Sequence, residues 1–537
     1  MTRAAELVLT GGRVATMDPA HPVTDAVAVR GGRIAALGSA AAELRGPATE
    51  VVDLRGRLLL PGFHDAHAHP VYGGLERLRC DLTASTSAAD CLRRIGAHRA
   101  AHPSGWLLGG GWDMGLFPGG TPSREALDAV TGTQPAYLVN RDHHGAWVNS
   151  AALRAAGIDA DTPDPPDGRI ERAADGSPAG MLHEGATGLV ARVLPPAGRE
   201  EYLAGLLEGQ RHLLERGVTM WHDAIVGPYL GYADTLEVYR DADRRGLLTA
   251  RVRGALWWDR ERGVEQLPEL RERRDRSRGE KFTAEAVKIM QDGVCESLTA
   301  ALLQPYLDTA PAGRHRGLSF LTAPELREAV VALDAAGFDV HFHAVGDRAV
   351  RDALDAVAAS GRRGRHQIAH VQVVHPDDVP RFGALGVTAT IQPLWAINDA
   401  AMTELTVPRL GRPRADGQYP FRALRDAGAD LAVGSDWPVS EADPVRAAHV
   451  AVHRREPGSE VPAFLPEQRL DLPAALAAST AGSARVNRLE HESGTLAVGM
   501  AADLVVLDRD PFALAADEIG DCAVDLTVVG GRIAHQR

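Results

Sequence analysis

The chain has 537 residues, more than one hydrophobic core usually includes, so its length predicts one large domain with a smaller one. Its 58 Lys and Arg residues are outnumbered by 71 Asp and Glu residues, and the formal charge of -13 argues against nucleic acid as a partner. The four cysteines form no CxxC pair, and no apolar run reaches the length of a signal peptide or a membrane span. We therefore expect a cytoplasmic protein with reduced thiols and no membrane partner.

Both ends of the chain are predicted to contribute strands to one small β domain. The first 56 residues contain apolar runs with Gly-Gly turns, in the segments ELVLTGGRVAT, AVAVRGGRIAAL and EVVDLRGRLL. The segments SGTLAVGMAADLVVLD and DLTVVGGRIA show the same pattern near the other end. We predict a small β-sandwich domain built from residues 1–56 and 488–537, which leaves residues 57–487 as a continuous domain between them.

This central part contains eight strand-like runs, most of them separated by helical stretches. In one such stretch, Leu326, Val330 and Leu333 recur at helical spacing and Gly337 ends the helix. Strands that alternate with helices imply a parallel sheet, and eight of them predict a mixed α/β fold with a closed (β/α)8 TIM barrel. The runs begin at Leu58, Gly217, Ala250, Ala286, Asp339, Arg365, Gly386 and Asp430.

The connection between the first and second runs is much longer than the others. It has about 145 residues, too many for an ordinary loop between a strand and a helix. We therefore predict an inserted subdomain after the first barrel strand, at about residues 72–210, and expect it to cover the mouth of the barrel.

Residues able to bind a divalent cation follow five of the eight strand-like runs. The first run ends in His67 and His69, and positions i and i+2 of a strand share a face, so both imidazoles can reach one ion. The other four ends bear Lys288, His343, His370 and Asp436. The chain has 21 histidines, so a single histidine is weak evidence of a metal site. The strand ends of a barrel, however, converge at one face. Neutral imidazoles and a carboxylate that meet there suit zinc.

Several motifs, in this order, resemble those of the amidohydrolase superfamily, and most closely its amidohydro-3 branch, with N-substituted formamide deformylase-like and YtcJ-like proteins. They are PGFHDAHAHP, GGWDMGLFP, TPSREALD, DHHGAWVNSAAL, GVTMWHDA, VKIMQDG, HFHAVGD, QIAHVQ, GSDWPV and GTLAVGMAADLVVLD. The resemblance covers nearly the whole chain. It implies a metal-dependent barrel that hydrolyses an amide or related C–N bond.

The resemblance also implies one or two divalent metal ions, with Zn2+ as the favoured ion. By position, His67 and His69 bind the more buried ion, His343 and His370 bind the second, and Asp436 lies beside the bridging water. These five residues and Lys288 form the predicted metal site.

Lys288 corresponds to a lysine that bridges two metals as a carbamate in the family. An ordinary lysine, with a pKa of about 10.4, is a cation and cannot bind a metal unless it is carboxylated or deprotonated. The alternative is a salt-bridged lysine beside a single metal. His341 precedes His343 in the same strand, and we expect His343 to be the ligand because it is followed by Ala-Val-Gly-Asp.

Catalysis by this site is expected to need Asp436 as general acid and base, and His144 to stabilise the developing oxyanion. A loop histidine that only bonds to backbone is the alternative for His144. Four further residues flank the motifs and are candidates for an apolar substrate pocket, although core packing explains each of them equally well. They are Trp112, Asp113, Trp395 and Trp437.

The function that these predictions favour is that of an enzyme, a hydrolase of carbon-nitrogen bonds other than peptide bonds, acting on N-formyl or N-acyl amides. A deaminase of heterocyclic amines shares the histidines and the aspartate but typically lacks the bridging lysine. Hydrolysis of phosphotriesters or lactones by the same water, and a non-catalytic metal-binding barrel, are further alternatives. The expected partner is a small-molecule substrate. Homodimers are common in the family, but no stretch of this sequence marks an interface.

Overall fold

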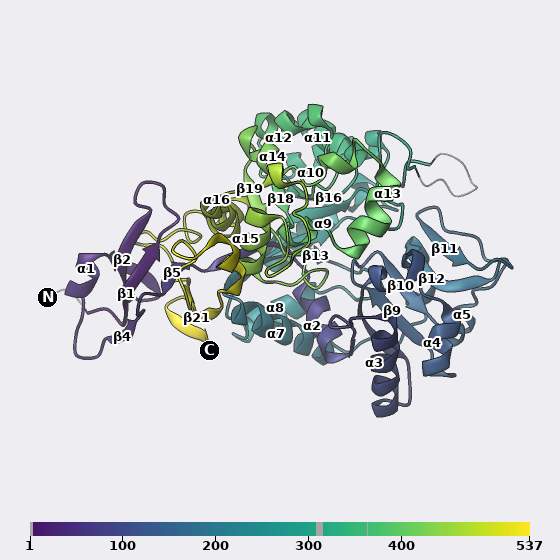
Figure 1. The fold of residues 1–537 in the computed structure, drawn as a ribbon, viewed down its shortest axis with the longest axis horizontal. Helices are drawn as coiled ribbons and strands as arrows, with labels where there is room; N and C mark the ends of the chain where they lie inside the picture. The colour runs from purple at the N-terminus through teal and green to yellow at the C-terminus, as the bar shows by residue number, and fades with distance from the viewer. Residues whose placement is uncertain (1–3, 308–314, 362–363) are drawn as a thin grey trace.

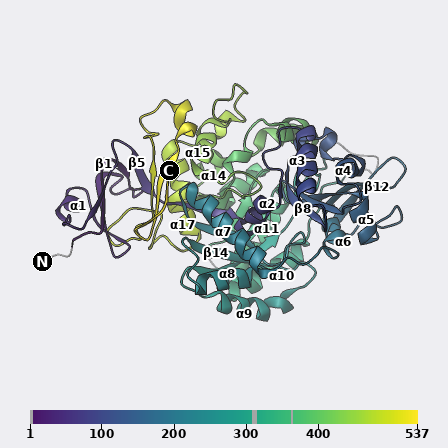
Figure 2. The ribbon, with the colours of Figure 1, turned by 90° about the horizontal axis from the view of Figure 1, so that it is seen from below.

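The protein consists of three β-sheets with their helices, placed one after another along its longest axis (Figure 1). The computed structural model describes residues 4–307, 315–361 and 364–537. A sheet made from both chain ends lies at one end, a parallel barrel lies in the middle, and a third sheet lies at the other end (Figure 2). Within the described residues, no helix combines the length and apolarity that crossing a bilayer requires.

Eight parallel strands form the central barrel. Between β19 and β6 the described residues form no ladder, but Asp436 N donates to His67 O at 2.7 Å and His69 N donates to Trp437 O at 2.8 Å. The prediction of a mixed α/β fold is confirmed, with a nearly closed barrel of the TIM type. Its strands are β6 (Phe63–Ala68), β13 (Val218–Val226), β14 (Arg251–Trp257), β15 (Phe282–Met290), β16 (Asp339–Ala344), β17 (Gln367–His370), β18 (Thr388–Ile391) and β19 (Leu431–Val433).

Amphipathic helices connect the strands and cover the barrel. Helix α10 begins after Thr322, whose side chain forms a capping box with Glu325, and it buries Leu326, Val330 and Leu333 as predicted. The barrel helices are α2 (Pro70–Leu78), α7 (Arg199–Glu215), α8 (Leu236–Arg244), α9 (Leu267–Ser277), α10 (Ala323–Ala335), α11 (Asp347–Ser360), α12 (Val379–Leu385), α13 (Val407–Leu410), α14 (Phe421–Asp426), α15 (Pro444–His453), α16 (Leu472–Ala477) and α17 (Ser483–Val486).

The terminal sheet joins strands from the two ends of the chain. Its strands are β1 (Leu7–Ala15), β2 (Val23–Arg30), β3 (Arg33–Leu37), β4 (Glu50–Asp53), β5 (Leu58–Pro61), β20 (Leu504–Leu507), β21 (Val524–Val529) and β22 (Arg532–Gln536), with α1 (Ser39–Glu43) beside them. The ends therefore meet in one sheet as expected, whereas the sandwich arrangement stays a prediction.

Glycine pairs make two of the tight turns in the terminal sheet. Gly31-Gly32 and Gly530-Gly531 all have positive φ, as a two-residue hairpin with a type I′ turn requires. Gly11-Gly12 instead lies inside β1, where the register shifts and the strand continues. The first predicted barrel run is also divided, because Leu58–Pro61 pairs in the terminal sheet and Phe63–Ala68 in the barrel.

The residues between α2 and α7 form the third sheet and its helices, which we call the insert. Its strands are β7 (Cys80–Asp81), β8 (Leu107–Trp112), β9 (Ala136–Asn140), β10 (Gly145–Val148), β11 (Gly168–Arg172) and β12 (Pro178–Glu184), and its helices are α3 (Ala88–Ala101), α4 (Arg124–Thr131), α5 (Ser150–Ala156) and α6 (Gly188–Ala191). The turn between β9 and β10, residues 141–144, extends to the barrel, where its last three residues line a cavity with the ends of the barrel strands.

Candidate metal centre

Three ligand-type side chains meet at the C-terminal ends of β6 and β19. The Nε2 atoms of His67 and His69 lie 3.2 Å and 3.0 Å from Asp436 Oδ1. One donor atom from each of the three residues lies within 4.8 Å of the others, and all three side chains are buried. The spacing of His67 and His69 in the strand therefore turns both rings toward the same carboxylate, as predicted.

The other predicted ligands line the same buried cavity. His343, at the end of β16, has its ring centre 4.3 Å from that of His370, at the end of β17. The His370 ring lies 5.0 Å from the His67 ring, and its Nδ1 lies 4.0 Å from Asp436 Oδ2. Lys288 Nζ, from β15, lies 3.5 Å from His67 Nε2. All six predicted metal-site residues are thus brought together.

The chemistry of these side chains fits a divalent cation. Among the described residues, both ring nitrogens of His370 and the Nδ1 of His69 are buried without a hydrogen-bond partner. Burial lowers the pKa of His343 and His370 well below the ordinary value, and at His370 it outweighs the opposing effect of the Asp436 carboxylate. The rings are therefore neutral at physiological pH, which is the form that binds a metal. A bound cation would supply the missing partners.

The pKa values of Lys288 and Asp436 are both lower than usual. Burial lowers the pKa of Lys288 to about 7, because a charged ammonium is costly in a site that is only 2% exposed. Burial alone would raise the pKa of Asp436, but the hydrogen bond from His69 and the nearby cationic groups lower it to about 2. Lys288 can therefore lose its proton near neutral pH, as carboxylation requires, while Asp436 is ionised.

The segment after β19 explains how Asp436 reaches His67. A Cβ at Gly434 would lie 2.5 Å from His67 Cβ, so only glycine allows the two segments to approach this closely. Ser435 then donates its hydroxyl to Asp65 at 2.5 Å, and Asp436 adopts a positive φ of 57°. Such a conformation is costly for a residue other than glycine and is typical of functional sites.

A chain of hydrogen bonds fixes the orientation of His67 from behind. His67 Nδ1 lies 2.8 Å from His341 Nε2, His341 Nδ1 lies 3.3 Å from His222 Nε2, and His222 Nδ1 lies 2.6 Å from Asn487 Oδ1. Asn487 Nδ2 donates to Ser483 O at 2.8 Å, which leaves Oδ1 as an acceptor. Each neutral ring then has its proton on Nδ1, so His67 presents a bare Nε2 to the centre. His341 thus bonds to His67, and His343 faces the cavity.

The insert contributes His144 to the same cavity. The His144 ring centre lies 5.0 Å from that of His343, and its Nδ1 lies 2.9 Å from Glu184 Oε1 on β12. Thr299 donates a further hydrogen bond to Glu184 Oε1 at 2.8 Å. Burial opposes a charge on His144, but the Glu184 carboxylate outweighs it and raises the pKa of His144 to about 9. His144 is therefore a cation at neutral pH, anchored by a side chain rather than only by backbone.

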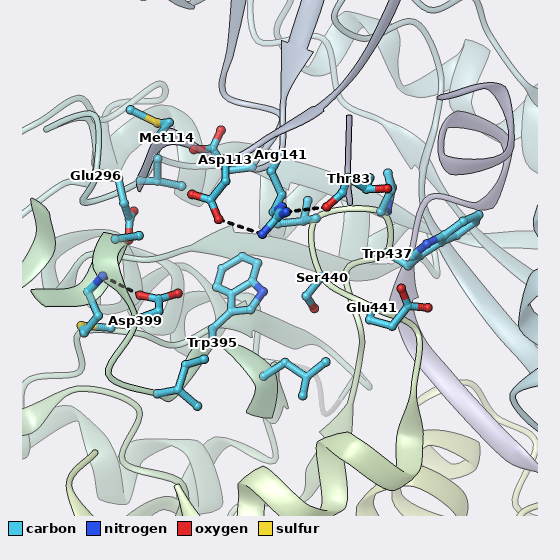
Figure 3. A pocket seen from close by; sticks show the side chains of 18 of the residues that line it. Thr83, Asp113, Met114, Arg141, Glu296, Trp395, Asp399, Trp437, Ser440 and Glu441 are labelled. Carbon is cyan, nitrogen blue, oxygen red and sulfur yellow. Dashed lines mark hydrogen bonds and ion pairs between the residues drawn. The ribbon is translucent and has the colours of Figure 1, made fainter. Parts of the chain in front are cut away.

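A second cavity, of about 440 Å³, adjoins the first and shares Asp142 and Val439 with it. Trp395 lines it, and the Trp395 ring stacks on His370 at 5.1 Å. Figure 3 shows the Trp395 ring inside this cavity, with Trp437 on another wall. The three predicted pocket residues Asp113, Trp395 and Trp437 therefore line a space beside the candidate metal centre.

Comparison with known proteins decides the family. A family model described as "Amidohydrolase family" matches residues 50–535. The chain belongs to the amidohydrolase family. It is 32% identical to "Protein LONG AFTER FAR-RED 3" of Arabidopsis thaliana over 98% of this chain and 91% of the relative. It is 28% identical to "N-substituted formamide deformylase" of Arthrobacter pascens over 100% of this chain and 99% of the relative.

A solved structure extends the similarity of this amidohydrolase to three dimensions. An uncharacterized metal-dependent hydrolase from Pyrococcus horikoshii is 27% identical, with a TM-score of 0.74 over 95% of this chain and 99% of the other. The predicted resemblance to the family is thus confirmed. Membership supports a hydrolase that uses a divalent metal, and the donor set described above fits one.

One predicted pocket residue of the amidohydrolase lies elsewhere. Trp112 is fully buried, donates from Nε1 to Leu138 O at 3.0 Å, and packs edge-on against Phe117 and Trp147 in the core of the insert. The prediction that Trp112 lines the substrate pocket is wrong, because its ring faces the insert core while the next residue, Asp113, faces the cavity.

Several residues around the centre were not found from the sequence. His143 lines the cavity beside His144, and its Nε2 lies 2.9 Å from Glu76 Oε1, which also accepts from the Tyr232 hydroxyl at 2.8 Å. The adjacent histidines in DHHG were a signal for it. Glu184, by contrast, lies 40 residues from His144 along the chain and belongs to no motif, so only the fold brings them together.

Proposed function

We propose that this amidohydrolase hydrolyses a C–N bond of a small amide, of the N-formyl or N-acyl type, with a metal-activated water. The observation that supports this most is the convergence of six ligand-type side chains on one buried cavity, beside a larger cavity that can accept a substrate. A relative that covers the whole chain is described as an N-substituted formamide deformylase, which favours the amide reaction over others.

In this proposal, His67, His69 and Asp436 would hold one divalent ion, and His343, His370 and a carboxylated Lys288 would complete a second position. A bound ion of this kind lowers the pKa of water to about 7 and polarises the carbonyl under attack. Zinc is the favoured ion because neutral imidazoles dominate the donor set. Asp292 supports this arrangement, since its carboxylate accepts from Val345 N and Gly346 N directly after β16.

Asp436 and His144 have different roles in this reaction. The ionised Asp436 carboxylate accepts the proton of the water as its oxygen attacks the carbonyl carbon, and it returns that proton to the leaving nitrogen as the C–N bond breaks. The cationic His144 donates a hydrogen bond from Nε2 to the carbonyl oxygen as negative charge develops there. Glu184 keeps the His144 ring in this orientation.

The test is metal quantitation together with a substrate panel. Protein purified with zinc supplementation is expected to contain about one or two zinc ions per chain and to hydrolyse at least one amide from a panel of N-formyl, N-acyl and cyclic amides. Release of ammonia from aminated heterocycles, with no amide hydrolysis, would favour the deaminase instead. Metal-free protein after the same purification would contradict the proposal and favour a non-catalytic barrel.

A further inference from the structure

The cavity beside the candidate metal centre is lined by more carboxylates than cations. Two of its carboxylates are neutralised locally, because Asp113 pairs with Arg141 at 2.7 Å and Glu456 pairs with Arg446 at 2.7 Å. A third, Glu441, lies 2.6 Å from Arg216. The surplus of negative charge in this cavity therefore belongs to the carboxylates that are not in these three pairs.

Three lining carboxylates, those of Asp142, Glu296 and Asp399, form no ion pair within the part of the chain that the structure describes. Asp142 accepts from His144 N at 2.8 Å, Glu296 accepts from the Thr406 hydroxyl at 2.8 Å, and Asp399 accepts from Met402 N at 2.7 Å. Neutral donors of this kind orient a carboxylate but do not cancel its charge.

Two of these carboxylates, those of Asp142 and Asp399, act electrostatically on the third, Glu296. Burial raises the pKa of Glu296, and the charges of Asp142 and Asp399 raise it further. Asp142 lies nearest the metal centre, since it lines both cavities, whereas Asp399 is exposed. The carboxylates therefore extend from the metal centre, at Asp142, toward solvent, at Asp399.

A fourth carboxylate of this cavity, that of Glu76, has an oxygen that accepts no hydrogen bond among the described residues. Glu76 lines the same cavity and is 1% exposed, yet its Oε2 has no hydrogen-bond partner among the described residues. Its other oxygen, Oε1, already accepts from Tyr232 and lies near His143. A buried carboxylate oxygen without a partner is costly, and a donor from a bound molecule would remove that cost.

An aromatic ring lies beside the surplus carboxylates. Figure 3 shows Glu296 and Asp399 to the left of the Trp395 ring, the paired Asp113 and Arg141 above it, and Trp437 with Glu441 to the right. An indole face attracts a cation through its quadrupole, and this attraction adds to that of a carboxylate within the same pocket. A neutral or anionic group would gain neither interaction.

From this arrangement we propose that the substrate of this enzyme bears a cationic amine, remote from the bond that is cleaved, which binds beside Trp395 between Glu296 and Asp399. This inference rests on the proposed amide hydrolysis and names its substrate class: an N-acyl derivative of a diamine or of another amine with a second, protonated nitrogen. The amide end would lie toward Asp142 and the metal centre.

The test compares three N-formyl amides that share one straight alkyl chain and end in an ammonium, a methyl or a carboxylate group, each made at several chain lengths. At the best length, kcat/KM for the ammonium compound is expected to exceed that for the methyl compound about tenfold or more, and the carboxylate compound is expected to be poorest. Equal or better use of the methyl compound at every length would overturn the proposal.

Variants test whether the carboxylates of Asp399 and Glu296 cause the preference for the ammonium compound. Asp399→Asn and Glu296→Gln are each expected to reduce the ratio of kcat/KM between the ammonium and methyl compounds about fivefold, because one charge is removed with little change in shape. Glu404→Gln is the matched control, since Glu404 is exposed on the same segment as Met402 but does not line the cavity, and its ratio should equal that of the wild type. An unchanged ratio in both cavity variants would contradict the assignment.

Binding separates this inference from the proposed reaction. Calorimetric titration of the metal-loaded Asp436→Asn variant with the same three compounds measures affinity without turnover. Tighter binding of the ammonium compound, without hydrolysis of any amide by the wild type, would support the amine-binding pocket and contradict amide hydrolysis. Hydrolysis of the amides with equal affinity for the ammonium and methyl compounds would support the reaction and contradict the amine-binding pocket.

Discussion

The barrel and the insert both supply side chains to the candidate active site, but they hold them in different ways. His67, His343 and His370 lie at the ends of strands whose direction is set by ladder hydrogen bonds. His144 lies in a turn between two insert strands and is held by one carboxylate, Glu184, from a third. The barrel thus fixes its residues through the backbone, whereas the insert depends on individual side chains.

Loss of the barrel aspartate is expected to have the largest effect. Asp436→Asn keeps an oxygen that can bind a cation but removes the proton acceptor, so kcat should fall about 100-fold or more while metal content is retained. Steady-state kinetics and metal analysis of the same sample provide the measurement. Wild-type turnover in this variant would exclude Asp436 as the base.

Loss of the insert histidine should have the next largest effect. His144→Ala removes the cationic donor and is expected to lower kcat about tenfold or more without loss of metal, since His144 lies outside the proposed ligand set. His102→Ala, at an exposed histidine of the insert, is the control and should match the wild type. An unchanged kcat in His144→Ala would show that His144 has a structural role and no catalytic one.

The hydrogen-bonded chain behind His67 predicts a smaller effect on metal affinity. Asn487→Leu removes the acceptor that fixes the tautomer of His222, and with it those of His341 and His67, so zinc affinity should fall about tenfold. Competition with a chelator measures this affinity. Asn487→Asp retains an acceptor oxygen, so its zinc affinity should fall less. An equal fall in zinc affinity in the two variants would contradict a role for the tautomer.

The side chain that supports His144 is expected to change the pH dependence of the reaction rather than its rate at the optimum pH. With a pKa of about 9, His144 is protonated at lower pH, and its hydrogen bond to the substrate is lost as pH rises through that value. Glu184→Gln removes the charge that raises the pKa, so the alkaline decline of kcat/KM should move to lower pH. Glu171→Gln, at the nearby His183 pair, should leave the pH profile in place.

The sequence predicts the barrel part of the site well because that part follows local rules. Spacing within one strand determines that His67 and His69 share a face, and the parallel barrel determines that five strand ends meet. Alternation does not separate His341 from His343, because positions i and i+2 share a face, and only the Ala-Val-Gly-Asp that follows His343 favoured it as the ligand. The bond from His341 to His67 depends on another strand and could not be predicted.

The insert was much less predictable. Trp112 and Asp113 are adjacent, yet only Asp113 lines the cavity, because the chain changes direction after β8 and no periodic pattern shows which side faces the barrel. Glu184 and Glu76 contact His144 and His143 through tertiary packing alone. Pairs of this kind have no signature in a single sequence.

The pairing of β20 with β5 has a consequence for truncated forms of the protein. Val505 and Val506 pair with Leu60 and Leu59, and the chain continues from β5 through Gly62 into the strand of His67. Deletion of the last 34 residues, from Leu504 onward, would leave one edge of β5 without its hydrogen-bond partner, about one short strand away from the proposed ligands. We therefore expect such a shortened chain to aggregate and to bind zinc poorly, even though it would contain every residue of the proposed centre.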